Sequence, residues 1–347
     1  MNLADLNKIA LAMVAPGKGI LAADESSGTI KKRFDAIKVE STEDSRRDYR
    51  EMLFRSNEAM RQCISGVILY DETIWQNAKD GTPLVKLIEQ SGAIPGIKVD
   101  EGTQALPNCP GELVTAGLDK LAERLKKYYG RGARFAKWRA VIDIGQGNDG
   151  PHIPTMTAIH VNAHALARYA ALCQAAQIVP IVEPEVLMDG DHDIDRCYEV
   201  TQRVLDKTFQ ELRVQRVALE GMILKPNMVV SGKKNAKQAS IEEVAEKTIR
   251  LLKACVPAAV PGIAFLSGGQ SDEDATAHLD AMNRIGGLPW RLTFSYGRAL
   301  QAAPQQAWAG KADNVAAGQR AFSHRARMNS LASKGEWKPD LEAKKAA

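Results

Sequence analysis

A lysine lies inside an apolar stretch of the sequence, where soluble proteins normally have no charged side chain. In residues 220–230, three apolar residues precede Lys225, and three more follow Pro226 and Asn227. The stretch predicts a short strand buried on both faces, and Pro226 limits ladder pairing, so Lys225 should lie near the strand's end. Loss of hydration there favours the neutral amine, which can attack a carbonyl carbon. We therefore expect a Schiff-base lysine; the alternative is a lysine that reaches solvent or pairs with a buried acid.

Charged and polar side chains recur in other strand-like segments of the chain. Where two such residues stand two positions apart, they point to the same face of a strand. Charges that several strands bring to one end of a barrel must compensate one another or bind a ligand. The repetition therefore predicts a shared catalytic site. Its candidate residues besides Lys225 are Asp24, Lys98, Lys137, Arg139, Glu183, Glu185 and Ser267.

This mixture of side chains suits imine chemistry. Imine formation needs a deprotonated amine and an acid/base group that removes water from the carbinolamine, and Glu183 and Glu185 supply carboxylates for that step. Lys137, if it lies beside Lys225, would favour the neutral amine by like-charge repulsion. Asp24 is left as a base for a substrate hydroxyl. The pattern leaves open which of the three strand lysines is the nucleophile.

Two loops near the end of the chain have the composition of an anion site. Ser267, Gly268 and Gly269 follow a strand-like run and precede an acid-rich helix start, so their backbone N–H groups could form an anion nest. Gly297 and Arg298 follow the last strand-like run. Phosphate sites in parallel barrels are often built by the loops after strands seven and eight. The alternative is that the two glycines only permit a tight turn.

Strand-like and helix-like segments alternate along the whole chain, which favours an α/β fold with a closed parallel (β/α)8 TIM barrel. An open doubly wound sheet is the alternative. No linker or composition shift marks a boundary, so we expect one domain over 1–347, with an N-terminal helix in 1–18 and a mobile tail over about 336–347. The predicted strands are 19–25, 64–70, 94–100, 135–142, 179–185, 222–230, 262–268 and 291–297. The predicted helices include 46–61, 118–128, 160–176, 195–212, 241–255 and 272–283.

Composition excludes several classes of protein. Hydrophobic residues make up 45% and charged residues 25% of the 347 positions, which is typical of a globular protein and argues against disorder. The net charge of +4 allows an anionic small molecule but does not indicate nucleic acid. Five scattered cysteines favour a reducing, cytoplasmic compartment. No stretch is long and apolar enough to span a membrane, so a membrane partner is not expected.

One glycine motif resembles a dinucleotide-binding loop. The segment GQGNDG at 145–150 matches the G-x-G-x-x-G pattern. Pro151 and Pro154 oppose a helix that opens directly from this loop, and the helix that follows offers no acid for a ribose. We therefore expect no dinucleotide and no other cofactor.

Three further motifs carry weaker signals. Residues 189–195 imitate the start of a calcium loop, but Ile194 occupies the position of the required glycine. His160 and His164 lie one helical turn apart, yet no glutamate follows His160 as a zinc-protease helix requires. The basic loop at 233–237 could attract anions, although solubility is its commoner role. We expect no metal from any of these motifs.

Seven short segments in order along the chain form a recognisable set: LAADES (21–26), GIKVD (96–100), FAKWR (135–139), PIVEPE (180–185), LKPNM (224–228), FLSGGQS (265–271) and LTFSYGR (292–298). Together they resemble class I fructose-bisphosphate aldolase. The resemblance extends from about residue 20 to residue 335 and implies a metal-independent, eight-stranded barrel enzyme of glycolysis and gluconeogenesis, a homotetramer. Such an enzyme is an aldehyde-lyase that reversibly cleaves fructose 1,6-bisphosphate to dihydroxyacetone phosphate and glyceraldehyde 3-phosphate.

The resemblance also implies roles for individual residues. Lys225 would form the Schiff base, Glu183 would be the main acid/base, and Asp24 would take the proton of the C4 hydroxyl. Lys137 would stabilise charge around the carbinolamine, with support from Glu185. The C1 phosphate would be held by Ser267, Gly268 and Arg298, and the C6 phosphate by Ser26, Thr29, Arg33 and Lys98. Arg139, Gly269, Ser295 and Gly297 complete the implied substrate-binding set.

The chain departs from this pattern at its end. Family members of the vertebrate type end in a tyrosine whose mobile tail reaches the site, whereas no tyrosine follows Tyr296 here. We therefore expect another group, or water, to protonate the carbanion or enamine. Two other functions are kept open: a Schiff-base lyase for a different sugar phosphate, and a binding or scaffold protein on the same barrel.

Overall fold

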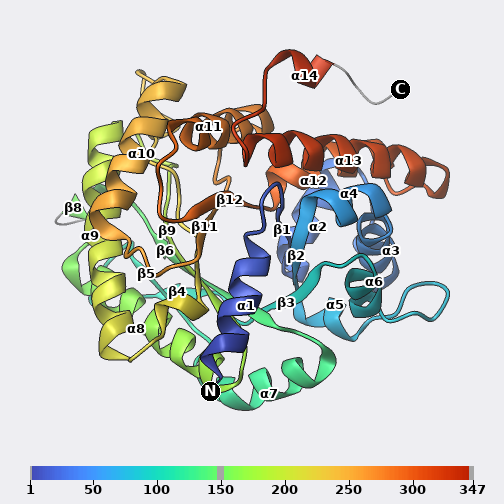
Figure 1. Cartoon of the computed structure of the whole chain (residues 1–347), viewed down its shortest axis with the longest axis horizontal. Helices are drawn as coiled ribbons and strands as arrows, with labels where there is room; N and C mark the ends of the chain where they lie inside the picture. The colour runs from blue at the N-terminus through green and yellow to red at the C-terminus, as the bar shows by residue number, and fades with distance from the viewer. Residues whose placement is uncertain (1, 147–151, 344–347) are drawn as a thin grey trace.

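The computed structural model describes residues 2–146 and 152–343, and its centre is a closed barrel of eight parallel strands (Figure 1). Around the barrel the strands follow the order β1-β12-β11-β10-β9-β6-β3-β2, and β1 pairs with both β2 and β12 to close it. The predicted closed barrel is confirmed and the open doubly wound sheet is wrong. The strands are β1 Gly19–Ala23, β2 Ile64–Leu69, β3 Ile94–Lys98, β6 Phe135–Ile142, β9 Val179–Val186, β10 Ile223–Leu224, β11 Gly262–Phe265 and β12 Arg291–Tyr296.

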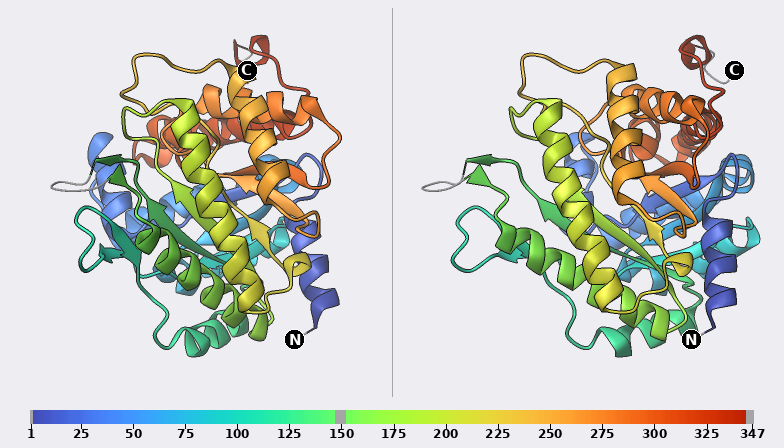
Figure 2. Two further views of the ribbon diagram at one scale, coloured as in Figure 1. Left: turned by 90° about the vertical axis from the view of Figure 1, so that its left-hand side faces the viewer. Right: turned by 60° about the vertical axis from the view of Figure 1, so that its left-hand side comes forward.

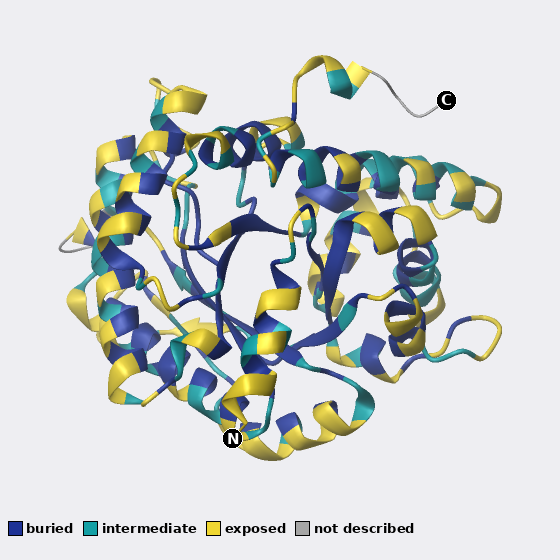
Figure 3. Cartoon of the chain, in the orientation of Figure 1, coloured by how far each residue is buried: buried dark blue, intermediate teal, exposed yellow. Residues whose placement is uncertain are grey.

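Helices surround the barrel with their apolar faces inward, and their exposed residues face outward (Figures 2 and 3). Polar caps begin several of them: Ser26 accepts from the N–H of Thr29 at the start of one helix, and Ser271 from that of Asp274 at another. The helices are α2 Ser27–Ala36, α3 Glu43–Phe54, α4 Asn57–Cys63, α5 Asp71–Trp75, α6 Leu84–Gln90, α7 Leu121–Arg131, α8 Met156–Ala175, α9 Ile194–Val214, α10 Ile241–Cys255, α11 Asp272–Ile285, α12 Arg298–Trp308 and α13 Val315–Ala332.

The N-terminal helix α1 (Leu3–Met13) packs against the inside of the barrel. Its apolar residues join a buried cluster with strand residues such as Ile20, Ile181 and Ile223. Phe135 fills the barrel interior, and Gly96 makes room for it, since a Cβ there would lie 2.3 Å from the ring. The end of the barrel where the strands begin is therefore apolar and filled, which leaves the carboxyl end for a site.

Three local predictions need correction. The strand predicted over 222–230 is β10, only two residues long, because Pro226 has no N–H to continue the ladder; residues 228–230 are buried without regular structure. The helix predicted over 46–61 is two helices, α3 and α4, divided at Ser56. A hairpin of β4 (Thr103–Ala105) and β5 (Leu113–Thr115) was not predicted.

The segment predicted as a mobile tail makes specific contacts as far as Glu342. Trp337 is buried, and its backbone N–H donates to Asp280 Oδ1 over 2.8 Å. The short helix α14 (Asp340–Ala343) places Glu342 beside Arg325 at 2.5 Å. Residues 344–347 lie outside the described part of the chain, and mobility of the tail stays a prediction.

The glycine motif at 145–150 is described only at its start. Gly145 and Gln146 form β7 (Gly145–Gln146), which pairs antiparallel with β8 (His152–Ile153), and the remaining four motif residues lie outside the described chain. Among the helices of residues 2–146 and 152–343, none is long and apolar enough to cross a membrane.

Candidate active site

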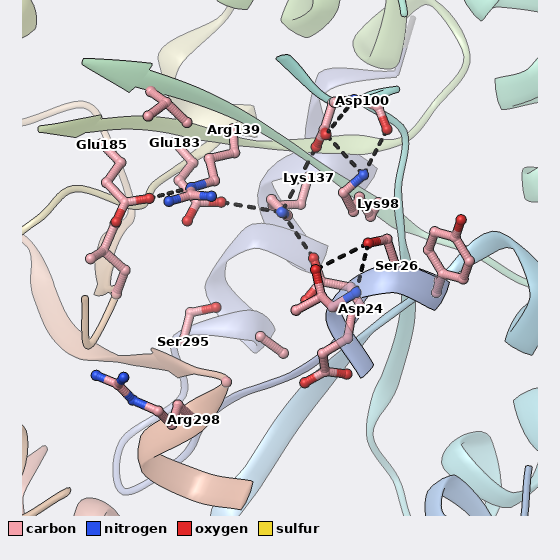
Figure 4. A pocket seen from close by; sticks show the side chains of 18 of the residues that line it. Asp24, Ser26, Lys98, Asp100, Lys137, Arg139, Glu183, Glu185, Ser295 and Arg298 are labelled. Atoms are coloured by element: carbon pink, nitrogen blue, oxygen red, sulfur yellow. Dashed lines mark hydrogen bonds and ion pairs between the residues drawn. The ribbon is translucent and has the colours of Figure 1, made fainter. Parts of the chain in front are cut away.

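The carboxyl ends of the barrel strands bring the predicted charged side chains into one cavity of about 1330 Å³ (Figure 4). Parallel strands all end at the same rim, so residues far apart in sequence meet there. Lys98 is opposite Lys137 in the β3–β6 pair, and Arg139 is opposite Glu183 in the β6–β9 pair. Lys225 follows β10 directly, and its backbone N–H still bonds Val182 O at 2.8 Å.

Glu183 lies between two lysines at the base of the cavity. Its Oε1 is 3.2 Å from Lys225 Nζ, and its Oε2 is 3.5 Å from Lys137 Nζ. The three side chains are each about 95% buried, with exposed fractions of 4–5%. Burial raises the energetic cost of an uncompensated charge, so the protonation states of these groups depend on one another.

Lys137 is surrounded by carboxylates. Asp24 Oδ2 lies 2.8 Å from its Nζ and Asp100 Oδ2 lies 3.8 Å away, in addition to Glu183. Burial alone would lower the pKa of Lys137, but these acids, Asp24 above all, outweigh it and raise that pKa. Lys137 is thus held as a cation, which makes it a poor nucleophile. Lys98 is 2.8 Å from Asp100 Oδ1.

The same contacts hold Asp24 ionised. Burial tends to raise the pKa of this carboxyl, but Lys137, Lys225 and Lys98 together lower it to about 2. Farther along β9, burial raises the pKa of Glu185, and the neighbouring Glu183 adds to that rise, while Arg139 opposes it through a direct ion pair. The site therefore lowers the pKa of one carboxyl group, Asp24, and raises that of another, Glu185, which is typical of acid/base catalytic sites.

Cationic and hydrogen-bonding groups lie at two opposite margins of the cavity. Arg298 donates to Gly268 O over 3.1 Å at one margin, beside Ser267. Ser26 caps α2 at the other margin, where Arg33 forms an ion pair with Glu25. Figure 4 shows Ser26 near Asp24, and Arg298 well apart from both, near Ser295. Helix starts and arginines are the groups that bind phosphate in proteins.

The predicted site residues line this cavity with one exception, Gly269. The turn at Gly268 has φ +54°, which favours glycine, so the tight-turn requirement is real there; Gly269 is instead covered by the side chain of Lys233. The residues that line the cavity are Asp24, Ser26, Thr29, Arg33, Lys98, Lys137, Arg139, Glu183, Glu185, Lys225, Ser267, Gly268, Ser295, Gly297 and Arg298.

Sequence reasoning missed two buried acids of the site. Asp100 lies two positions after Lys98 and shares its face of the chain, so the spacing rule applied to other strands could have found it. Glu25 follows Asp24 and is 6% exposed; it binds Arg33 and accepts from Gln301 Nε2 at 2.8 Å. No local pattern marks Glu25, because one partner, Arg33, is eight residues away on the next helix and another, Gln301, comes from a distant part of the chain.

Of the weaker motifs, the histidine pair does not line this cavity. His160 and His164 point their Nδ1 atoms at Glu211 across α8 and α9, at 3.4 and 3.1 Å. Within residues 2–146 and 152–343, no group of three or more His, Cys, Asp or Glu residues has the arrangement of a metal site. Asp189, from the acidic loop 189–195, does line the cavity.

Fold and site together define an α/β-barrel enzyme whose buried amine is equipped to react with the carbonyl group of an anionic compound. Comparison with known proteins narrows this class to one family. The family model described as fructose-bisphosphate aldolase class-I matches residues 5–347, so the chain belongs to the class I fructose-bisphosphate aldolase family.

Individual relatives are similar to this chain over nearly its full length. A protein of Xanthomonas campestris named probable fructose-bisphosphate aldolase class 1 is 56% identical over 97% of this chain and 100% of its own. A cytosolic fructose-bisphosphate aldolase of Arabidopsis thaliana is 53% identical over 94% of this chain and 90% of its own. Fructose-bisphosphate aldolase from Plasmodium falciparum, solved in complex with TRAP and a small-molecule inhibitor, superposes with a TM-score of 0.93 at 48% identity, over 97% and 96% of the two chains. The family and enzyme class that the sequence predicted are confirmed.

Proposed function

We propose that Lys225 is the amine through which this chain performs its family's reaction, the reversible cleavage of fructose 1,6-bisphosphate to dihydroxyacetone phosphate and glyceraldehyde 3-phosphate. The observation that supports this assignment is that the lysines of the site differ in the number of carboxylates around them. Lys137 has three acids within 4 Å and Lys98 is bound to Asp100, whereas Lys225 contacts Glu183. An amine with fewer compensating charges gives up its proton at lower cost.

The cleavage direction begins at the C2 carbonyl. The neutral amine of Lys225 attacks this carbon to give a carbinolamine, and Glu183 donates the proton with which the hydroxyl leaves as water, so that a protonated imine (an iminium) forms. Asp24 accepts the proton of the C4 hydroxyl, the C3–C4 bond breaks, and its electron pair neutralises the iminium to give an enamine. Glyceraldehyde 3-phosphate leaves, C3 takes up a proton, which restores the iminium, and water hydrolyses the iminium to release dihydroxyacetone phosphate and the free amine of Lys225.

Lys137 and Glu185 support these steps without bonding to the substrate carbon. Lys137, held cationic by its acids, keeps Asp24 ionised for its role as base and stabilises negative charge near the carbinolamine. Glu185 fixes Arg139 through their ion pair, so that the arginine is oriented towards the cavity. Charged groups that are already in place before the reaction stabilise the charge of the transition state without rearranging, and so they lower the activation barrier.

The two cationic margins correspond to the two phosphates of the substrate. We assign Ser267, Gly268 and Arg298 to the C1 phosphate, with Ser295 and Gly297 beside them. Ser26, Thr29, Arg33 and Lys98 are assigned to the C6 phosphate at the opposite margin, which also favours a bisphosphate over a substrate with one phosphate.

Borohydride reduction in the presence of dihydroxyacetone phosphate, followed by peptide mapping, tests the nucleophile. The label should attach to Lys225 and should be absent from Lys225→Met. Lys98→Met is the matched control, because it removes an ammonium from the same cavity and should leave labelling intact. Attachment at another lysine, or retained turnover in Lys225→Met, would overturn the mechanism. Activity should also survive treatment with a chelator.

A Schiff-base lyase for another sugar phosphate is the competing function. Cleavage rates with fructose 1,6-bisphosphate and fructose 1-phosphate separate the two, since a second phosphate site gives an advantage to the bisphosphate alone. Equal or no preference would contradict the substrate assignment. We also propose a cytoplasmic location, which the cytosolic relatives support, and a homotetramer, which light scattering on the purified protein can test.

A further inference from the structure

A cation outside the family resemblance lies against the proposed C1-phosphate loop. Lys233 belongs to the basic loop 233–237, and the end of its side chain covers Gly269. A methyl group added to Gly269 would lie 1.6 Å from Lys233 Cε and 2.0 Å from its Nζ. The end of the Lys233 side chain thus occupies the space that a Cβ at position 269 would take, and its ammonium lies directly on the phosphate loop.

The ammonium is paired with an acid that lines the cavity. Asp189 lines the cavity, and its Oδ1 is 2.6 Å from Lys233 Nζ. The lysine and aspartate side chains are 39% and 60% exposed, so solvent weakens their attraction. An incoming phosphate, which carries more charge than one carboxylate, can compete for this ammonium.

The backbone around Lys233 is fixed, so that only the side chain needs to move. The N–H of Lys233 donates to Met188 O over 2.7 Å, and that of Gly232 to His192 O over 2.8 Å. The sulfur of Met188 in turn accepts from the N–H of Gly269 at 2.9 Å. These bonds join the loop after β9, the loop after β10 and the phosphate loop into one unit. Rotation about the bonds of the flexible lysine side chain can move its ammonium while the backbone stays in place.

We propose that Lys233 is a second cation for the C1 phosphate, in addition to Arg298, with Asp189 as its counter-ion until a phosphate displaces it. Arg298 contacts the same turn, where its Nη2 lies 3.1 Å from Gly268 O and 3.3 Å from Gln270 O. The phosphate loop is thus in contact with both a planar guanidinium and an ammonium. The inference rests on the proposed function, since it concerns the phosphate of the same ketone that Lys225 binds.

The simplest competing explanation is that Lys233 only neutralises Asp189. A charge-neutral double variant, Lys233→Met with Asp189→Asn, separates the two explanations, because it removes the lysine without leaving an unpaired acid. If Lys233 only neutralises Asp189, the double variant binds phosphate as the wild type does. If Lys233 contacts the phosphate, the double variant binds it more weakly.

Affinity for dihydroxyacetone phosphate, measured by borohydride trapping at graded concentrations, is the first readout. We expect Lys233→Met to weaken it roughly tenfold, and the double variant roughly three- to tenfold, because a half-exposed cation is screened. Lys233→Arg should retain most of the affinity. Lys234→Met is the matched control, since Lys234 is exposed and next in the chain, and it should bind as the wild type does. Dihydroxyacetone, which has no phosphate, should be trapped equally by all variants.

Wild-type affinity in the double variant, or equal weakening for dihydroxyacetone, would overturn the role of Lys233. If the wild type is labelled by neither ketone, the Schiff-base function itself fails. Calorimetric titration with inorganic phosphate then still decides the role of Lys233, because this measurement needs no imine: the double variant must bind phosphate more weakly than the wild type and Lys234→Met.

Discussion

Asp24→Asn tests the electrostatics of the site through stability. The pKa of Asp24 falls from 3.8 to about 2 on folding, as burial is outweighed by Lys137, Lys225 and Lys98. A shift of this size corresponds to about 2 kcal/mol. Because the pKa is lower in the folded state, ionised Asp24 stabilises the fold fully above pH 3.8, and the contribution is lost as the pH falls towards 2.

The assay is urea unfolding of wild type and Asp24→Asn followed by tryptophan fluorescence at pH 6, 4 and 3. Groups common to both proteins cancel, so the difference in unfolding free energy reports Asp24. We expect the advantage of the wild type to shrink by about 1 kcal/mol between pH 6 and pH 3. Asp35→Asn is the matched control, since Asp35 forms an exposed ion pair with Lys31 that should contribute little to the unfolding free energy. A difference for Asp24→Asn that does not change with pH would refute the claim that Lys137 holds this carboxylate ionised.

Three further outcomes are expected. Glu183→Gln should lower kcat by about a hundredfold or more through loss of the acid/base group, seen as slow imine formation in rapid-quench trapping; unchanged imine formation would exclude the role. Arg33→Met should raise KM roughly tenfold for fructose 1,6-bisphosphate but not for fructose 1-phosphate, whereas Arg298→Met should raise both; the reverse pattern would exchange the two phosphate sites. Trp337→Ala should lower the unfolding free energy by about 3 kcal/mol in denaturant melts, against little change for the exposed Trp75→Ala; equal effects would mean that the end of the chain does not dock.

The barrel and most of its cavity were predictable because both follow from local rules. Alternating strand and helix patterns give the order of elements, and parallel strands place their carboxyl ends at one rim. These rules do not predict which charged side chains form ion pairs across that rim. Asp24 and Lys137 lie 2.8 Å apart although more than a hundred residues separate them in sequence. Which lysine is held charged depends on such distances, and they are fixed only when the barrel closes.

Gly269 shows the same limit at the level of a loop. Two consecutive glycines suggest one shared purpose, yet only Gly268 has a positive φ, and the space beside Gly269 is occupied by the side chain of Lys233. This side chain comes from the loop after another strand. Sequence spacing detects conformational requirements of a turn, but it cannot detect a neighbour that packs onto the turn from outside.

The position of Glu183 has a consequence for how the reaction starts. Its carboxylate lies 3.2 Å from Lys225 Nζ, close enough for a direct proton transfer. In the proposed mechanism, one proton moved from Lys225 to Glu183 would produce both the neutral amine for the attack on C2 and the carboxylic acid for the later loss of water. Lys137, bound on its other side to Asp24, keeps the remaining negative charge compensated in either arrangement. We therefore infer that nucleophile and acid are prepared by the same transfer, so that Glu183→Gln should slow carbinolamine formation as well as its dehydration.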